Sequence, residues 1–291
     1  MKTSAVWKLV GFAFLVAGMT VRGAVDRDDF SVPHDYLMDG VEGTVWDGFF
    51  YNVTGGDAVV SIADADTANT GRLTFRSVRG NWENADNDGI LLYKTVAGDF
   101  DAMVRVVSMN TVQWHDAGIM ARVADLEAAG PGEDWVAVKH FQSSNNTGHR
   151  NTDNGASTTS TPVSLQPWLR LARVGNTFTS YRSTDGLVWS QIRSTVRNDM
   201  DGLPVQVGLW QATFSDNEGT AVFDHVVLRQ PERWGLEDGG SWGSPESWNG
   251  VVPDGTSDWA VFPVTIRNYC RVMLDGDRKL GWLTFGATNG A

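Results

Sequence analysis

A long run of short apolar segments separated by turn residues dominates the middle of this sequence. Between residues 98 and 228 the segments are rich in Val, Trp, Phe and Leu and are bounded by Gly, Asn, Asp or Pro, as in GDFDAMVRVVSM, AGIMARVAD and VQVGLWQAT. This pattern is typical of β-strands joined by turns. After residue 24, no stretch sustains the 3.6-residue apolar repeat of a helix. The sequence therefore predicts an all-β fold.

The first 23 residues have the three zones of a secretory signal. Lys2 and Lys8 precede an apolar run, LVGFAFLVAGM, and small or apolar residues follow near Gly23. The run is shorter than the roughly 20 residues that a bilayer-spanning helix needs, which favours a cleaved signal over an anchor. We therefore expect a secreted or cell-surface protein with no membrane insertion after cleavage.

The net charge limits the classes of binding partner, and the cysteine content excludes an internal disulfide. The formal net charge is -12, and the signal carries three cations and no acid, so removal of the signal leaves -15. Such a surface repels phosphate backbones, which disfavours nucleic acid and leaves neutral glycans compatible. Cys270 is the single cysteine, so no internal disulfide forms and we interpret it as a buried strand residue.

The chain divides near residue 230. We expect one β-sandwich over residues 24–230, with hairpin turns at Gly175-Asn176 and Asp185-Gly186. The polar stretch 143–161 has no apolar pattern and predicts a long loop. Residues 231–291 are dense in Trp, Gly, Ser and Asp, and predict a short β-rich segment too small for a large core of its own.

Five motifs in the central region carry a family resemblance. They are GDFDAMVRV (98–106), DAGIMARV (116–123), WLRLARVGNTFTSYRSTDGLVW (168–189), VQVGLWQA (205–212) and AVFDHVVL (221–228). In order and spacing, the chain from about residue 40 to 230 resembles the DUF1349 family of concanavalin A-like domains. The resemblance implies an antiparallel jelly-roll sandwich related to modules appended to bacterial glycosidases. It supplies no catalytic residues, because none are established for the family.

The tail carries a second resemblance. SWNGVVPDGTSDWAVF (247–262) and LGWLTFG (280–286) are similar to the start of the autotransporter-associated β-strand repeats of secreted bacterial proteins. The resemblance covers about residues 234–291 and implies a solenoid-like segment. Because one such unit precedes Ala291, we expect a truncated repeat.

The acidic residues do not form an obvious catalytic pair. A glycosidase needs two carboxyl groups that face one sugar at a defined separation. Glu133 and Asp134 are adjacent, so on a strand they would point to opposite faces, and we interpret them as a solvated loop end. The stretch 183–189, STDGLVW, resembles a shortened Asp-box but also fits a plain hairpin turn. We therefore expect no enzyme, with a weak glycoside hydrolase as an alternative.

A loop before residue 90 has the spacing of a cation site. Asn84, Asp86 and Asp88 place oxygen-bearing side chains at alternate positions before a glycine, as in the first half of a calcium loop. The twelfth position is Thr95 rather than a bidentate Glu. Two interpretations stay open, a structural calcium site and a polar turn that binds no metal. Otherwise we expect no cofactor.

Strand parity indicates which face binds a ligand. If Val205, Val207 and Leu209 face the core, Trp210 faces outward, and the same argument places Arg122 and Lys139 on the outer side. Aromatic faces and long polar side chains suit sugars, and Trp82 and Trp114 near strand ends would extend the surface. The alternative is that these tryptophans are ordinary sandwich packing.

We therefore expect a non-catalytic glycan-binding or surface-interaction module of a secreted bacterial protein, with a polysaccharide as its partner. A structural spacer or adhesin module that leads into a solenoid is the alternative. The sequence leaves the identity of the glycan and the oligomeric state open.

Overall fold

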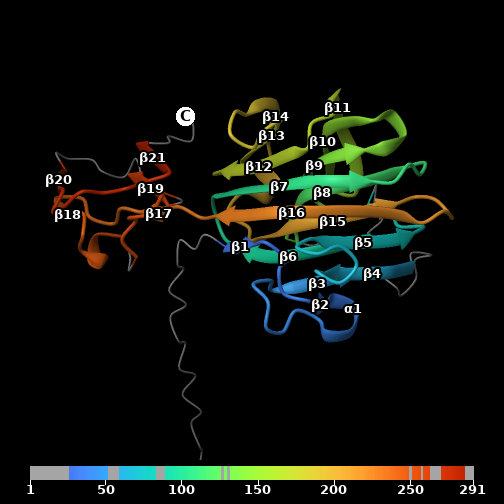
Figure 1. Cartoon of the computed structure of the whole chain (residues 1–291). Coiled ribbons are helices and arrows are strands. Elements are labelled where there is room, and N and C mark those ends of the chain that lie inside the picture. The colour runs from blue at the N-terminus through green and yellow to red at the C-terminus, as the bar shows by residue number, and fades with distance from the viewer. Residues whose placement is uncertain are drawn as a thin grey trace, which may run out of the picture.

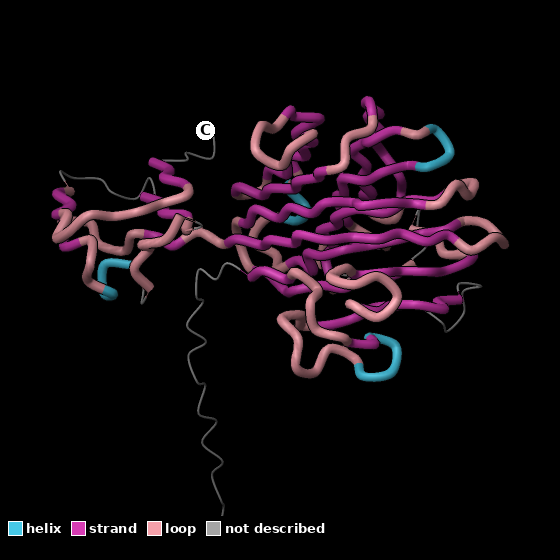
Figure 2. Tube along the Cα trace, in the orientation of Figure 1, coloured by secondary structure: helices cyan, strands magenta, loops and turns pink. Residues whose placement is uncertain are grey.

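The computed structural model describes residues 26–51, 59–82, 89–125, 128–129, 132–248, 251–256, 258–262 and 270–285. Two antiparallel sheets pack face to face, and a smaller β-rich segment lies at one end of them (Figures 1 and 2). The described helices are single turns, α1 (Tyr36–Asp39), η1 (Gln142–Ser144), η2 (Asn198–Met200) and η3 (Pro245–Trp248). No helix in these ranges has the length and apolar character to cross a membrane. The predicted signal, residues 1–23, lies outside the described residues.

The first sheet has nine strands. Its order is β14 (Ser190–Val196), β13 (Thr177–Ser183), β12 (Trp168–Val174), β7 (Phe100–Met109), β16 (Gly219–Arg229), β5 (Leu73–Val78), β4 (Val59–Ala65) and β2 (His34–Asp35), with β1 (Asp26–Asp28) also paired to β16. All pairings in this sheet are antiparallel. The predicted turn at Gly175-Asn176 joins β12 to β13, and Asp185-Gly186 lies between β13 and β14.

The second sheet has seven strands and carries the site described below. Its order is β11 (Ala156–Ser164), β10 (Asn146–Asp153), β9 (Trp135–Phe141), β8 (His115–Val123), β15 (Val205–Thr213), β6 (Ile90–Val96) and β3 (Gly48–Tyr51). Thr95, the twelfth position of the proposed calcium loop, lies inside β6. Asn84, Asp86 and Asp88 themselves lie outside the described residues.

The core lies between the two sheets. Alternate residues of β8 and β15 point inward, including Ile119, Val207 and Leu209, and pack against Phe75 and Phe223 of the nine-stranded sheet. Because side chains alternate along a strand, Met120 and Trp210 point outward, as the parity argument predicts. A second apolar cluster therefore covers part of the outer face of the seven-stranded sheet.

The prediction of a long loop over residues 143–161 is wrong. After η1 the chain forms β10 and β11, joined by Asn154-Gly155 with φ values of 50° and 74°. A two-residue turn with positive φ at both positions is the geometry that closes tight hairpins. The strands β10 and β11 show no apolar alternation because the side that faces the other sheet is polar. There His149 bonds to Ser180 Oγ (2.9 Å) and Thr195 Oγ1 (3.0 Å).

The C-terminal segment has a different strand geometry. β17 (Glu232–Arg233), β19 (Trp259–Phe262) and β21 (Trp282–Phe285) pair in parallel, as do β18 (Gly239–Ser241) and β20 (Arg271–Met273). Successive passes therefore stack on one another in a solenoid-like way, around the buried rings of Trp234, Trp242, Trp248 and Phe262. Cys270 is half-buried and precedes β20 rather than lying in a strand. The repeat resemblance itself stays a prediction.

Candidate functional site

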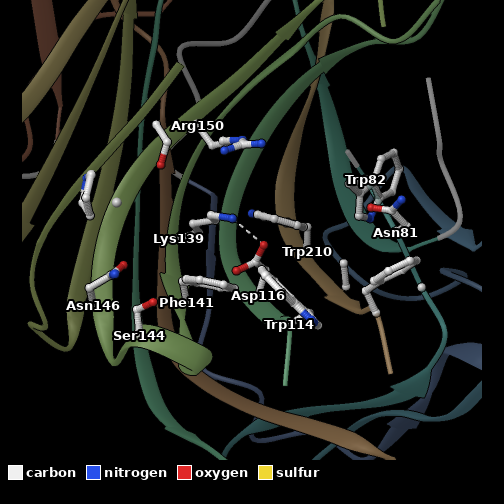
Figure 3. Close-up of a pocket in the computed structure, with 16 residues that line it drawn as sticks. Asn81, Trp82, Trp114, Asp116, Lys139, Phe141, Ser144, Asn146, Arg150 and Trp210 are labelled. Atoms are coloured by element: carbon white, nitrogen blue, oxygen red, sulfur yellow. Dashed lines mark hydrogen bonds and ion pairs between the residues drawn. The ribbon is translucent and has the colours of Figure 1, made fainter. Parts of the chain in front are cut away.

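A cleft of about 510 Å³ lies on the outer face of the seven-stranded sheet. Its floor comes from β15, β8, β9 and β10, one side from residues 80–82, and the other from β11 (Figure 3). The described residues that line it are Gly80, Asn81, Trp82, Trp114, Asp116, Lys139, Phe141, Ser144, Asn146, Gly148, Arg150, Ser160, Pro162, Trp210, Ala212 and Phe214. A concave site that mixes aromatic and polar groups is typical of small-ligand recognition.

An ion pair occupies the floor. Lys139 Nζ of β9 contacts Asp116 Oδ2 of β8, and each side chain keeps about a tenth of its surface exposed, 9% and 11%. Gly118 lets β8 and β9 approach closely, since a β-carbon there would lie 2.2 Å from Val138 O and 2.9 Å from Lys139 Cα. Lys139 Nζ also lies 5.0 Å from the centre of the Phe141 ring. The floor thus presents fixed polar groups beside an aromatic ring.

Exposed aromatic rings form the rim. Trp114 is 51% exposed, and its ring centre lies 5.9 Å from that of Phe141. Trp114 has a backbone φ of 57°, and its N–H donates to Ser143 Oγ at 2.5 Å. Phe214, which is 60% exposed, donates its backbone N–H to Trp114 O. Trp82 and Trp210 border the cleft but expose 1% each. The faces that a ligand can reach are therefore those of the rim.

Four of the five predicted binding residues line the cleft: Trp82, Trp114, Lys139 and Trp210. Arg122 is on the predicted face but lies outside the described lining, further along β8. Its Nε and Nη2 donate to the two Glu133 oxygens, both at 2.6 Å, and Nη1 donates to Gln206 at 2.9 Å. It also stacks on Phe50 and Trp82 (4.9 and 5.6 Å) and is 4% exposed, so its guanidinium supports the wall.

The sequence reasoning missed the contribution of β10 and β11. Asn146, Gly148 and Arg150 of β10 complete the floor of the cleft, and Ser160 and Pro162 of β11 line one side. They were hidden because this stretch was predicted to be a loop. The Thr- and Ser-rich segments on either side of Asn154-Gly155 were the signal for a hairpin.

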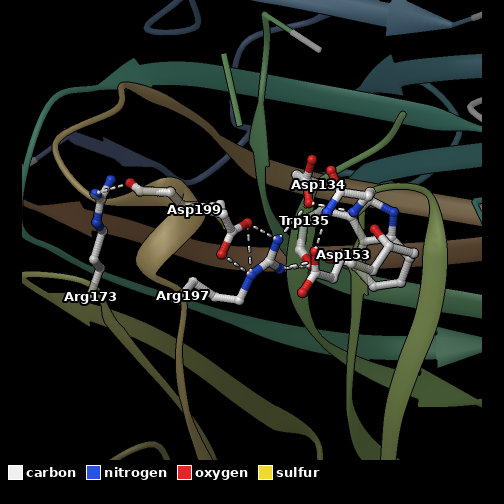
Figure 4. A network of polar contacts seen from close by, with 9 residues as sticks. Asp134, Trp135, Asp153, Arg173, Arg197 and Asp199 are labelled. Atoms are coloured by element: carbon white, nitrogen blue, oxygen red, sulfur yellow. Dashed lines mark hydrogen bonds and ion pairs between the residues drawn. The ribbon is translucent and has the colours of Figure 1, made fainter. Parts of the chain in front are cut away.

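Glu133 and Asp134 are not a solvated loop end, since each is 1% exposed. Asp134 Oδ1 accepts from Arg197 Nη2 at 2.7 Å, and the same guanidinium bonds to Asp199 (Figure 4). Burial raises the pKa of Asp134, opposed by Arg197 and by the backbone N–H of Asn154. Asp134, Asp153 and Asp199 bring carboxylate oxygens within 4.8 Å of one another, where the Arg197 guanidinium also lies. Both acids therefore belong to structural ion pairs.

The histidines near the cleft are buried and neutral at pH 7. His115 alternates with its neighbours and points to the core side, so it does not approach Asp116 of the cleft. Burial lowers the pKa of His115, His140 and His149 to about 4 each. His140 bonds to Gln166 O at 2.7 Å. These imidazoles are not among the described residues that line the cleft.

Two antiparallel sheets with this strand order, and a cleft on the outer face of one, define a concanavalin A-like jelly-roll sandwich. Residues 67–231 match the family described as "Protein of unknown function (DUF1349)", and the chain belongs to that family. Among curated proteins no sequence matches the chain.

Similar folds occur among solved structures. The GH43 protein BlXynB from Bacillus licheniformis superposes with a TM-score of 0.50 at 15% identity, over 70% of this chain and 39% of that chain. A functionally unknown protein from Saccharomyces cerevisiae gives 0.48 at 18% identity, over 63% and 95%. The endo-β-1,3-glucanase from Pyrococcus furiosus gives 0.48 at 10% identity, over 69% and 92%. At 15% identity, the likeness to BlXynB concerns the fold.

Proposed function

We propose that the cleft binds a glycan and that the protein is a non-catalytic, secreted glycan-binding module. The observation that carries the proposal is the exposed Trp114 ring beside the Lys139–Asp116 pair, in a cleft of about 510 Å³. An aromatic face offers an apolar surface to the C–H face of a sugar ring, and fixed charged groups bond to hydroxyls. The acidic net charge of -12 suits an uncharged glycan.

The acid content of the cleft supports binding rather than hydrolysis. Hydrolysis requires two carboxyl groups about 5–5.5 Å or about 6.5–9.5 Å apart across the sugar bond. Asp116 is the one acid among the described lining residues, and its carboxylate is paired with Lys139. Glu133 and Asp134 are held by Arg122 and Arg197. A weak hydrolase that uses Glu133 and Asp134 would have to break both pairs.

A structural spacer is the second candidate function. The stacked parallel passes of β17, β19 and β21 support it, because such stacks extend by adding passes. The two candidates predict different outcomes in one experiment. A spacer that is folded binds no glycan, whereas a binding module does.

The test is a glycan array followed by affinity electrophoresis of the full-length protein and its Trp114→Ala variant. We expect the wild type to bind at least one polysaccharide and the variant to bind it at least tenfold more weakly, about 1.4 kcal/mol. Folding should be unaffected because Trp114 is half exposed. Trp189→Ala, a half-buried tryptophan beside Arg170 of the other sheet, is the matched control and should bind normally. Equal binding by Trp114→Ala and the wild type would contradict the proposed site.

A further inference from the structure

The cleft is asymmetric in the direction that crosses the strands. One row of outward-facing residues runs through it in register, namely Pro162, Gly148, Lys139, Gly118, Trp210 and Leu91. Gly148 lines the cleft and has no side chain, so the row forms a trough that is lowest between Lys139 and β11. The floor rises at β15, where the indole of Trp210 packs in the outer apolar cluster.

Trp82 closes the trough beyond Trp210. The centre of its ring lies 5.5 Å from that of Phe50 of β3, and the ring shares the outer apolar cluster with Leu91 of β6. The ring is fixed in place, since a β-carbon on Gly89 would come within 1.7 Å of Trp82 Nε1. An aromatic ring therefore covers the face of β6 and β3, over which the trough would otherwise continue.

The opposite end of the trough is open. β11 is the last strand of the ladder in the described residues, and its cleft-facing Ser160 and Pro162 are both exposed. Four strand spacings of about 4.8 Å separate β11 from β15, so the trough is about 19 Å long. It suits a short stretch of a chain that enters from one side.

From this asymmetry we infer that the cleft holds the end of a glycan chain rather than an internal stretch. The terminal sugar lies toward Trp82 and Trp210, the next sugars lie over Lys139 and Gly148, and the rest of the chain leaves over β11. The inference depends on the proposed glycan-binding function. End binding further means that each glycan chain offers one binding site per suitable end, whatever the length of the glycan.

The experiment counts binding sites against chain ends. Xylan, laminarin and galactomannan are the probes, and the one that binds most strongly on the array is cut by limited hydrolysis into long and short fractions. Equal masses of each fraction are titrated calorimetrically into the full-length protein. For end binding, the number of sites per gram rises in proportion to the number of chains. Borohydride reduction then shows which end is bound, because it alters only the reducing ends. A loss of affinity after reduction means that the reducing end is bound, and an unchanged affinity means that the non-reducing end is bound.

The outcomes separate the two hypotheses. A number of sites per gram that does not change with chain length would overturn end binding while leaving glycan binding intact. A folded protein that binds nothing on the array contradicts glycan binding itself.

A variant at the open end gives an independent measurement. Ser160→Trp places a bulky ring at an exposed position where the chain should leave. We expect at least fivefold weaker binding of the long fraction and less than a twofold change for the disaccharide of the same polymer. Ser194→Trp, also exposed but on β14 of the other sheet, is the control and should change neither affinity. Unchanged binding of the long fraction by Ser160→Trp would count against an exit over β11.

Discussion

At the scale of single residues, the cleft depends on which neighbours have no side chain. Gly118 faces Lys139 across the β8–β9 ladder, and a β-carbon there would lie 2.2 Å from Val138 O, so the glycine permits the close approach of the two strands that carry the Lys139–Asp116 pair. Two opposite charges this far from solvent interact more strongly than a surface pair, and the loss of one leaves the other poorly solvated.

A double-mutant cycle on Asp116→Asn and Lys139→Met should therefore show coupling. We expect each single variant to lower the free energy of unfolding, and the double variant to lose about 1–3 kcal/mol less than the sum of the two. Urea denaturation monitored by tryptophan fluorescence gives the values. Losses that add to within about 0.5 kcal/mol would mean that the pair does not stabilise the floor.

At the scale of elements, Arg197 fastens the seven-stranded sheet to the η2 turn. Its Nη1 donates to Thr152 O of β10 at 2.6 Å and to Trp135 O of β9 at 3.2 Å, while Nη2 bonds to Asp134 and Asp199. The strands that carry Lys139 and Arg150 are thus held by one buried cation. Replacement of Arg197 should therefore lower the free energy of unfolding and also shift the strands that form the floor of the cleft.

Arg197→Met should destabilise the fold by about 3–5 kcal/mol, because it leaves Asp134 buried without its counter-charge. Chemical denaturation of the purified variant measures this loss. The comparison is Asp216→Ala, which removes the exposed acid beside Arg79 and should cost about 1 kcal/mol or less. A loss for Arg197→Met as small as that of the control would show that the buried network contributes little.

At the scale of the whole molecule, buried histidines make stability depend on pH. His115 Nδ1 donates to Asn110 O at 3.3 Å, His140 donates to Gln166 O, and His149 bridges the two sheets. The folded-state pKa values of about 4 lie below the unfolded value of about 6.5. Between these values the unfolded chain binds more protons, so stability is fully present above about pH 6.5 and is lost as pH falls toward 4.

We expect the free energy of unfolding to fall by several kcal/mol, on the order of 3 or more, between pH 7 and pH 4. Urea titrations at several pH values measure the slope. His140→Gln keeps a donor for Gln166 O and removes one titrating group, so its slope should be shallower than that of the wild type. Carboxylates that lose their charge in the same range are common to both proteins, and identical slopes would exclude His140 as a contributor.

Much of the fold could be predicted because its strands are amphipathic in period two. Val205, Val207 and Leu209 face the core as the alternation predicts, and Gly175-Asn176 closes a hairpin. β10 and β11 could not be found this way, because the inner face at that end of the sheet is made of hydrogen-bonded residues such as His149.

The site was predicted in part for the same reason. The alternation of side chains along the strands gave the correct face for Lys139 and Trp210. It could not show that the Arg122 guanidinium is paired with Glu133. Likewise, Arg197, the residue that pairs with the Asp134 carboxylate, lies 63 residues away in the sequence. Local pattern determines direction along a strand, whereas ion pairs between distant segments depend on the tertiary arrangement.

Pro162 has a further consequence for how these molecules meet one another. It lies on the outermost strand opposite Gly148, and proline has no N–H to offer a neighbouring backbone. Natural sheets use this substitution to blunt a border that would otherwise recruit another polypeptide. Two copies that paired along β11 would therefore lack the backbone donor at this position, which disfavours edge-to-edge pairing at the open end of the trough.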